Sequence, residues 1–124
     1  MTAPAVILAI EDEPRNAALL RAALRPDSFE LHVATSLGDG RAWLAERTPD
    51  VILLDRHLPD GDGLDLVREL RAAPGGAAQR ILLVTASVLS IDREAATEAG
   101  CDAFIAKPIN VHGLIEEIRR QLAR

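Results

Sequence analysis

The stretch VILLDRHLPDGDG, from Val51 to Gly63, joins an unbroken apolar run to a polar segment rich in turn-forming residues. The run from Val51 to Leu54 is typical of a short strand buried on both faces, and Asp55 ends it. A buried strand gains nothing from an ionised end. We therefore expect Asp55 either to cap a neighbouring backbone group or to carry out chemistry at the end of the strand.

Four further segments are predicted to be strands. Three of them are short apolar runs like the one before Asp55, and the fourth alternates polar and apolar residues, as an edge strand does. The apolar runs are Ala5–Ile10, Arg80–Thr85 and Ala103–Ala106, and the edge strand is Glu30–Ala34.

Helical patterns fill the gaps between these strands. A proline is a favourable first residue of a helix, and a glycine such as Gly100 is a favourable stop. The predicted helices run from Pro14 toward Leu24, over about Asp39 to Arg47, through Leu64, Val67 and Leu70, over about Asp92 to Ala99, and through Val111, Leu114, Ile115, Ile118 and Leu122. Strand and helix alternate five times, which predicts an α/β fold: a doubly wound, five-stranded parallel sheet with helices on both faces.

Length and composition limit the class of protein. With 124 residues the chain is expected to form one domain, and 48% apolar and 27% charged residues are typical of a soluble globular protein. The net charge of −5 argues against direct nucleic-acid binding. Cys101 is the only cysteine, which fits a reducing compartment. The apolar start is short and acidic residues follow at once, so we expect neither a signal peptide nor a membrane span and place the protein in the cytoplasm.

The predicted strand ends carry most of the reactive residues. The carboxyl ends of parallel strands share one edge of a sheet, where such folds place their functional residues. The residues expected there are Glu11, Asp12 and Glu13 after the first strand, Asp55 after the third, Thr85 and Ser87 at the fourth, and Lys107 after the fifth. Crowded carboxylates repel one another, and a few hard oxygen ligands suit Mg²⁺. An aspartate can also attack phosphorus and form an aspartyl phosphate. No G-x-G-x-x-G or Walker loop supports nucleotide binding.

Four segments occur in order along the chain and together resemble the receiver domain of two-component response regulators: VILAIEDEPRN, DVILLDRHLPDGDGLDLVRELR, ILLVTA and GCDAFIAKPI. The resemblance implies a flavodoxin-like (βα)5 fold with the strand order 2-1-3-4-5, and it implies that residues 1–124 are a single receiver domain without an effector domain. It also implies a signalling phosphoacceptor rather than an enzyme. Such a protein takes a phosphoryl group from a phosphohistidine donor with Mg²⁺ and loses it by slow autodephosphorylation.

By position, the resemblance assigns a role to each strand-end residue. Asp55 corresponds to the phosphoacceptor and Asp12 to a direct Mg²⁺ ligand. Asp55 itself and the backbone carbonyl of His57 complete the protein ligands, and Glu11 acts on the metal indirectly. Thr85 corresponds to the hydroxyl that contacts the phosphoryl group.

The remaining assignments concern switching and hydrolysis. Lys107 corresponds to the amine that contacts the phosphoryl group, and Phe104 occupies the position of the switch aromatic, where the family often has tyrosine. Thr85 and Phe104 are expected to move on phosphorylation and to repack the face made by the fourth helix, the fifth strand and the fifth helix. The His57 ring and Ser87 overhang the path of the attacking water and are expected to tune hydrolysis.

The resemblance implies protein partners at both ends of the signal. The phosphoryl donor is a histidine kinase or a histidine phosphotransfer protein. The output face serves a downstream protein, a covalently linked domain or a second copy in a homodimer. Neither nucleic acid nor a membrane is expected as a direct partner. A cis peptide bond before Pro108 is also implied.

A strand-end aspartate is also compatible with two other functions. A Mg²⁺-dependent phosphohydrolase of the haloacid-dehalogenase type also uses a strand-end aspartate, but it needs a second aspartate where this chain has His57, and it needs a cap domain. A docking module that is not phosphorylated is the other alternative, against which the intact set of acidic, hydroxyl and lysine residues argues. Glu11 and Asp12 could also cap the helix that begins at Pro14. The DGDGLD segment lacks the oxygen ligand that a calcium loop needs at Leu64.

Overall fold

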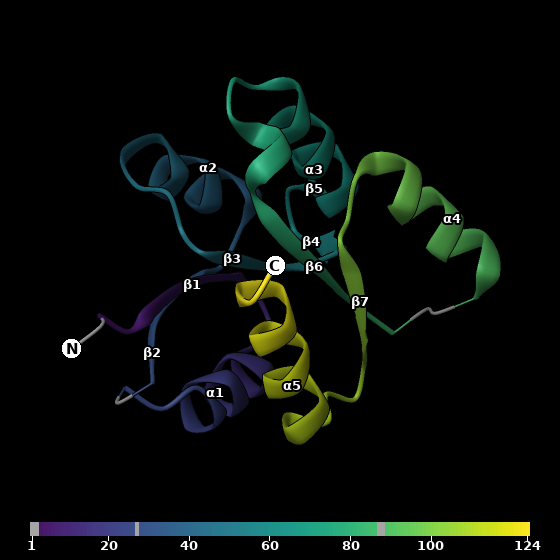
Figure 1. Ribbon diagram of the computed structural model, residues 1–124. Helices are drawn as coiled ribbons and strands as arrows, with labels where there is room; N and C mark the ends of the chain where they lie inside the picture. The colour runs from purple at the N-terminus through teal and green to yellow at the C-terminus, as the bar shows by residue number, and fades with distance from the viewer. Residues whose placement is uncertain (1–2, 27, 87–88) are drawn as a thin grey trace.

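The computed structural model describes residues 3–26, 28–86 and 89–124, and its centre is a five-stranded parallel sheet (Figure 1). The strands are β1 (Ala5–Ile10), β2 (Phe29–Ala34), β3 (Val51–Asp55), β6 (Arg80–Thr85) and β7 (Ala103–Ala106). Their order across the sheet is β2-β1-β3-β6-β7, and every neighbouring pair is parallel. The predicted strand order is therefore confirmed, with β2 at an edge as its alternating pattern predicts.

Among the described residues, the α-helices that cover the sheet are α1 (Pro14–Ala23), α2 (Leu37–Glu46), α3 (Gly63–Ala72), α4 (Ser90–Ala99) and α5 (Val111–Leu122). Helices α1 and α5 lie on one face, and α2, α3 and α4 lie on the other (Figure 1). Successive strand residues point to opposite faces, so Leu53 and Leu82 belong to one buried cluster and Leu54 and Leu83 to the other. The sheet is doubly wound, as predicted.

The ends of the helices follow the sequence signals with one correction. Gly100 ends α4 with a φ of 113°, a left-handed conformation that favours glycine. The N-cap of α1 is Glu13, whose side chain accepts a hydrogen bond from the N–H of Arg15 at 3.1 Å. The capping role considered for Glu11 and Asp12 therefore belongs to Glu13, because its carboxylate directly precedes the first turn.

A small hairpin follows β3, and the hydrophobic pattern did not predict it. Strands β4 (His57–Leu58) and β5 (Gly61–Asp62) pair antiparallel, and α3 begins at the next residue. A short 3-10 helix, η1 (Gly76–Ala78), follows α3. The other predicted boundaries agree with the structure to within one or two residues.

Arg71, near the end of α3, links several segments close to the amino ends of β6 and β7. Its guanidinium donates hydrogen bonds to the carbonyl oxygens of Gly76, Gln79 and Gly100 and to the carboxylate of Asp102. Asp102 also accepts a backbone N–H of β6 at 2.7 Å. One side chain thus joins α3, the end of α4 and the amino ends of two strands.

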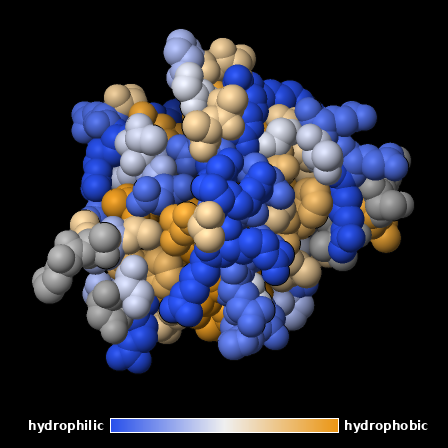
Figure 2. All heavy atoms as spheres, in the orientation of Figure 1, coloured by the Kyte–Doolittle hydropathy of each residue, from blue (hydrophilic) through white to orange (hydrophobic). Residues whose placement is uncertain are grey.

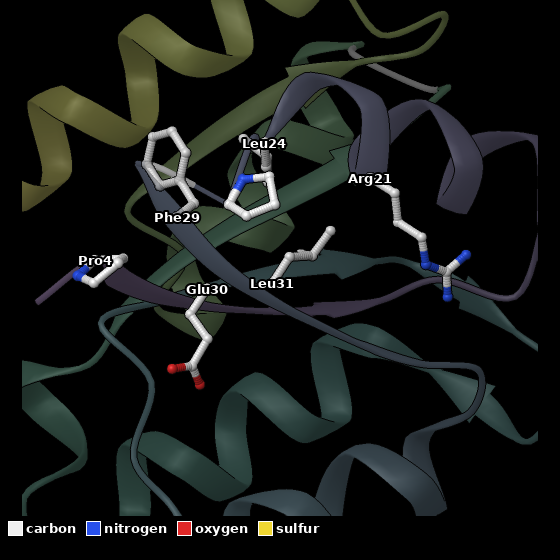
Figure 3. Close-up of a pocket in the computed structure, with 7 residues that line it drawn as sticks. Pro4, Arg21, Leu24, Phe29, Glu30 and Leu31 are labelled. Atoms are coloured by element: carbon white, nitrogen blue, oxygen red, sulfur yellow. The ribbon is translucent and has the colours of Figure 1, made fainter.

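The surface mixes polar and apolar residues on the face shown in Figure 2. A cavity of about 550 Å³ lies between the end of α1 and the start of β2 (Figure 3). Leu24, Phe29 and Leu31 line it together with Arg21 and Glu30. It lies near the amino ends of β1 and β2, so it is separate from the strand-end residues predicted to be functional. No helix in the described part of the chain has the length and apolar character needed to cross a membrane.

Candidate functional site

Asp55 is the last residue of β3, the central strand of the sheet, and its side chain is only 8% exposed. Strand β3 lies between β1 and β6, and its apolar residues are buried between the two helical layers. The strand therefore holds one carboxylate in a fixed place at the edge of the sheet, surrounded by the ends of its neighbours.

Lys107 brings two of the predicted carboxylates together. Its Nζ lies 3.0 Å from Oδ2 of Asp55 and 3.3 Å from Oε1 of Glu11. The backbone N–H of Lys107 donates to the carbonyl oxygen of Thr85 at 2.9 Å, which fixes the residue beside the end of β6. The peptide bond between Lys107 and Pro108 is cis, as the resemblance implied. The residues that follow β1 and end β3 thus meet at the ammonium of Lys107, and the end of β6 pairs with the Lys107 backbone.

Burial and charge shift the pKa values of two groups in this cluster. Burial raises the pKa of Glu11, and the charge of Asp55 raises it further, against the lowering effects of the hydrogen bond from the N–H of Glu13 and of the Lys107 charge. Burial by itself lowers the pKa of Lys107, but the hydrogen bonds and charges of Asp55 and Glu11 outweigh it and raise that pKa overall. Lys107 is therefore held as an ammonium ion, and Glu11 binds a proton more readily than an exposed glutamate does.

Three carboxylates form a group that can hold a cation. Oxygens of Glu11, Asp12 and Asp55 lie within 4.8 Å of one another, with Asp12 exposed and the other two buried. These carboxylates outnumber the ammonium of Lys107, so uncompensated negative charge remains at the cluster. Oxygen donors that are open to solvent on one side suit Mg²⁺, which keeps several waters. The residues present therefore fit the predicted metal.

A close contact between α3 and β3 supports the position of Asp55. Gly63, the first residue of α3, donates its N–H to the carbonyl oxygen of Arg56 at 2.6 Å. A Cβ at Gly63 would lie 2.6 Å from the carbonyl oxygen of Asp55, so a larger residue would force the backbone apart. Sequence reasoning missed this contact because a glycine beside a turn does not show which backbone it approaches.

The hairpin after β3 places two polar residues in different surroundings. The N–H of His57 donates to Oδ1 of Asp55 at 3.3 Å, and His57 is exposed. Asp60, at the hairpin turn, accepts the N–H groups of Leu37 at 2.8 Å and of Gly38 at 2.9 Å. The hydrogen bonds from Gly38 and Leu37 hold the pKa of the Asp60 carboxyl below its usual range. Asp60 thus caps α2, a role that sequence reasoning also missed.

The predicted switch residues lie on the two strands beyond Asp55. Thr85 is the last residue of β6 and is buried. Phe104 in β7 is partly buried and packs against the core under α2, α3 and α4. Ser87 lies outside the described residues. The roles assigned to these three residues stay predictions.

The sequence matches the model of the response regulator receiver domain over residues 7–119. The chain belongs to this family. The predicted identification as a receiver domain is thereby confirmed, and it is favoured over the phosphohydrolase alternative.

Two curated relatives of this receiver domain are named as regulators. The chain is 36% identical over 118 residues to the KDP operon transcriptional regulatory protein KdpE of Escherichia coli, covering 95% of this chain and 51% of that protein. It is 35% identical over 121 residues to the DNA-binding response regulator MtrA of Mycolicibacterium smegmatis, covering 95% and 50%. The chain therefore spans about half the length of the curated relatives it matches.

Solved receiver structures share the fold. A putative response regulator from Chloroflexus aurantiacus superposes with a TM-score of 0.91 at 29% identity, covering 98% of this chain and 99% of that one. The receiver domain of sensor histidine kinase PA1611 from Pseudomonas aeruginosa gives a TM-score of 0.88 at 30% identity, covering 98% and 100%. That structure has a magnesium ion coordinated in its active site cleft.

Proposed function

We propose that this receiver domain accepts a phosphoryl group on Asp55 in a two-component phosphorelay. The observation that carries the proposal is the ammonium of Lys107, 3.0 Å from the Asp55 carboxylate, within a carboxylate group suited to Mg²⁺. In the transfer, an Asp55 oxygen forms a bond to phosphorus while the bond from phosphorus to the imidazole nitrogen of the donor breaks, and its electron pair stays on that nitrogen. The domain is then the acceptor of the phosphoryl group, and it does not pass that group to a further substrate.

Lys107 and Thr85 contact the transferred group in this proposal. Positioning and charge neutralisation supply most of the catalysis in phosphoryl transfer. The raised pKa of Lys107 keeps its side chain cationic, and its contact with Oδ2 of Asp55 orients the carboxylate before transfer. The buried hydroxyl of Thr85, at the end of the adjacent strand, is assigned to another phosphoryl oxygen.

We assign Mg²⁺ binding to Asp12, Asp55 and the backbone carbonyl of His57, with Glu11 acting indirectly. When bound, Mg²⁺ neutralises charge that develops on the phosphoryl oxygens. The magnesium in the PA1611 receiver domain supports this assignment. The exposure of Asp12 fits a direct ligand that shares the metal with water, and the contact of buried Glu11 with Lys107 fits an indirect role.

The proposal extends to switching and hydrolysis. Thr85 and Phe104 move after phosphorylation and repack the surface formed by α4, β7 and α5. A cavity of about 270 Å³ on that surface, bordered by Phe104, Pro108 and Leu114, supports a docking role. The exposed ring of His57, together with Ser87, governs the entry of the water that removes the phosphoryl group.

The proposed partners lie on both sides of this signal. The donor is a histidine kinase or a histidine phosphotransfer protein. The output partner is a downstream protein, a covalently linked domain or a second copy of the chain. The curated relatives are about twice as long as the matched region, which supports a linked domain. We propose residues 1–124 as one receiver domain, acting in the cytoplasm.

Phosphorylation with a small donor tests the proposal. Acetyl phosphate and Mg²⁺ should add the mass of one phosphoryl group to the intact protein. Asp55→Asn should abolish the addition because an amide is no nucleophile, and a metal chelator should abolish it in the unchanged protein. Asp65→Asn, which alters an exposed aspartate of α3, is the matched control and should be labelled normally. Labelling of Asp55→Asn at the normal level would show that another residue is the acceptor.

A further inference from the structure

Arg56 directly follows the proposed phosphoacceptor, and its backbone is held on two sides. Its N–H lies 3.4 Å from the carbonyl oxygen of Val84 in β6, and its own carbonyl oxygen accepts the N–H of Gly63 at 2.6 Å. Gly63 packs closely against the strand end, since a Cβ there would lie 2.6 Å from the carbonyl oxygen of Asp55. The Arg56 side chain therefore extends from a backbone that is hydrogen-bonded on both sides.

The guanidinium of Arg56 connects the starts of α3 and α4 to the end of β3. Nη1 lies 3.3 Å from Oδ1 of Asp92 in the first turn of α4. Nε lies 3.5 Å from Oδ1 of Asp62, the residue that caps α3 through the N–H of Leu64. The Arg56 side chain is 18% exposed and that of Asp92 is 28% exposed, so solvent screens this ion pair less than it screens a surface pair.

The hydrogen-bonding demand of Arg56 is not fully met in this arrangement. Its buried Nε has no hydrogen-bond partner among the described residues, since Asp62 lies in ion-pair range but without hydrogen-bond geometry. A buried donor without a partner is unfavourable. The contacts of the guanidinium with Asp62 and Asp92 are therefore not optimal for all of its donors, and its position can respond to a change in the charge nearby.

The described side chains of α4 bury less apolar surface than those of α3. Its described buried side chains are those of Ala96 and Ala99, which remove little apolar area from water. On the same face, α3 buries Leu64, Leu66 and Val67. The far end of α4 is held by Arg71, which donates to the carbonyl oxygen of Gly100. Two arginines from outside α4 thus hold its two ends.

We infer that Arg56 is a positioning residue that ties the first turn of α4 to the strand end at Asp55 and passes the effect of phosphorylation to that turn. The second half of the inference rests on the proposed function. A phosphoryl group adds negative charge to the residue next to Arg56, so the guanidinium, shared between Asp62 and Asp92, acquires a third anion to balance. The first turn of α4 responds, while the turn held by Arg71 does not.

Amide hydrogen exchange of the unmodified protein tests the tie itself. In Arg56→Met and in Asp92→Asn, the amides of residues 92–95 should exchange several-fold faster than in the unchanged protein, and those of residues 97–100 should be unaffected. Arg93→Met and Glu94→Gln remove exposed charges from the same turn and are the matched controls. Exchange at residues 92–95 that is equally slow in all five proteins would overturn the inference.

The phosphoryl mimic beryllium fluoride, added with Mg²⁺, tests the transmission. Binding should change exchange at residues 92–95 in the unchanged protein, and Arg56→Met and Asp92→Asn should bind the mimic but lose at least half of that change. Arg56→Lys, which keeps the charge, should restore part of it, which a purely structural loss would not allow. Full responses in Arg56→Met and Asp92→Asn would refute transmission through Arg56. If the unchanged protein does not bind the mimic, the proposed function fails and transmission fails with it, while the exchange of the unmodified protein still decides the tie.

Discussion

Lys107 explains how a buried strand can end in a carboxylate. An ionised carboxylate that leaves water without a partner is strongly destabilising. Asp55 has the ammonium of Lys107 at 3.0 Å and the N–H of His57 at 3.3 Å, and Glu11 shares the same ammonium. One ammonium group therefore stabilises two buried carboxylates. It neutralises only part of their charge, and Mg²⁺ can neutralise the rest.

His57 is expected to control the lifetime of the phosphorylated protein. Its backbone contacts Asp55 while the residue is exposed at the site, so the ring can block water, orient it or accept a proton from it. We predict that His57→Ala changes the rate of phosphoryl loss at least several-fold and leaves Mg²⁺ affinity unchanged. The decay of phosphorylated protein after removal of the donor, followed at several pH values, measures the rate, and isothermal titration measures the affinity.

His112→Ala is the control for this substitution, because His112 is exposed on α5 and pairs with Glu116. It should decay like the unchanged protein. Equal decay of His57→Ala and the unchanged protein at every pH would mean that only the backbone of His57 matters.

At the scale of elements, the hairpin after β3 stabilises α2 through Asp60. Two N–H groups at the start of α2 donate to its carboxylate, where a helix also favours negative charge. Asp60→Asn retains one oxygen and no charge, so we predict a lower Tm at neutral pH. The pKa of Asp60 is lowered in the folded protein from the ordinary value of 3.8. Its contribution to stability is therefore complete above the unfolded pKa and is lost as the pH falls through the folded pKa.

The pH dependence separates this role from a general loss of packing. The Tm values of Asp60→Asn and the unchanged protein should differ at pH 7 and approach each other as the pH falls below 3.8, since protonation removes the charge that the variant also lacks. Glu98→Gln removes an exposed charge near the end of α4, and its Tm should not approach that of the unchanged protein in the same way as the pH falls. A Tm difference that persists unchanged in acid would contradict the charge-based cap.

At the scale of the whole molecule, Arg71 joins elements that have no covalent connection nearby. Its side chain is 19% exposed and that of Asp102 is 15% exposed, so Arg71→Leu leaves a largely buried carboxylate and several carbonyl groups without their partner. We predict a loss of about 3 kcal/mol in the free energy of unfolding, measured by urea denaturation. The folded variant should still be labelled by acetyl phosphate, because the contacts of Arg71 lie at the amino ends of the strands and Asp55 lies at the carboxyl end of β3.

Arg68→Leu is the matched control in the same helix. Arg68 pairs with Asp65 in an exposed contact, with side chains 56% and 65% exposed, and such pairs contribute less than about 1 kcal/mol. A similar loss of stability in both variants would indicate that α3 is sensitive to any such substitution, and not that the contacts of Arg71 are stabilising.

The sequence by itself determined the strands of the main sheet, the α-helices and most of the residues of the candidate site. Apolar runs and helical spacing marked all five strands of the main sheet and the helices between them, because burial imposes a period on local sequence. Residues at strand ends are neighbours of those runs in the chain, so Asp55, Glu11, Asp12 and Lys107 could be expected at one edge. The strand order came from the family resemblance and not from periodicity, which does not record which strands pair.

Only the tertiary structure decided which side chains meet across elements. Asp60 and Leu37 are 23 positions apart, Arg56 and Asp92 are 36 apart, and Arg71 and Asp102 are 31 apart. No local pattern marks such contacts, since each charged partner alone is typical of a surface or turn residue, and Leu37 takes part through its backbone N–H. They form because α2, α3 and α4 pack side by side on one face of a twisted sheet, and this packing brings each charge to the backbone or counter-ion that stabilises it.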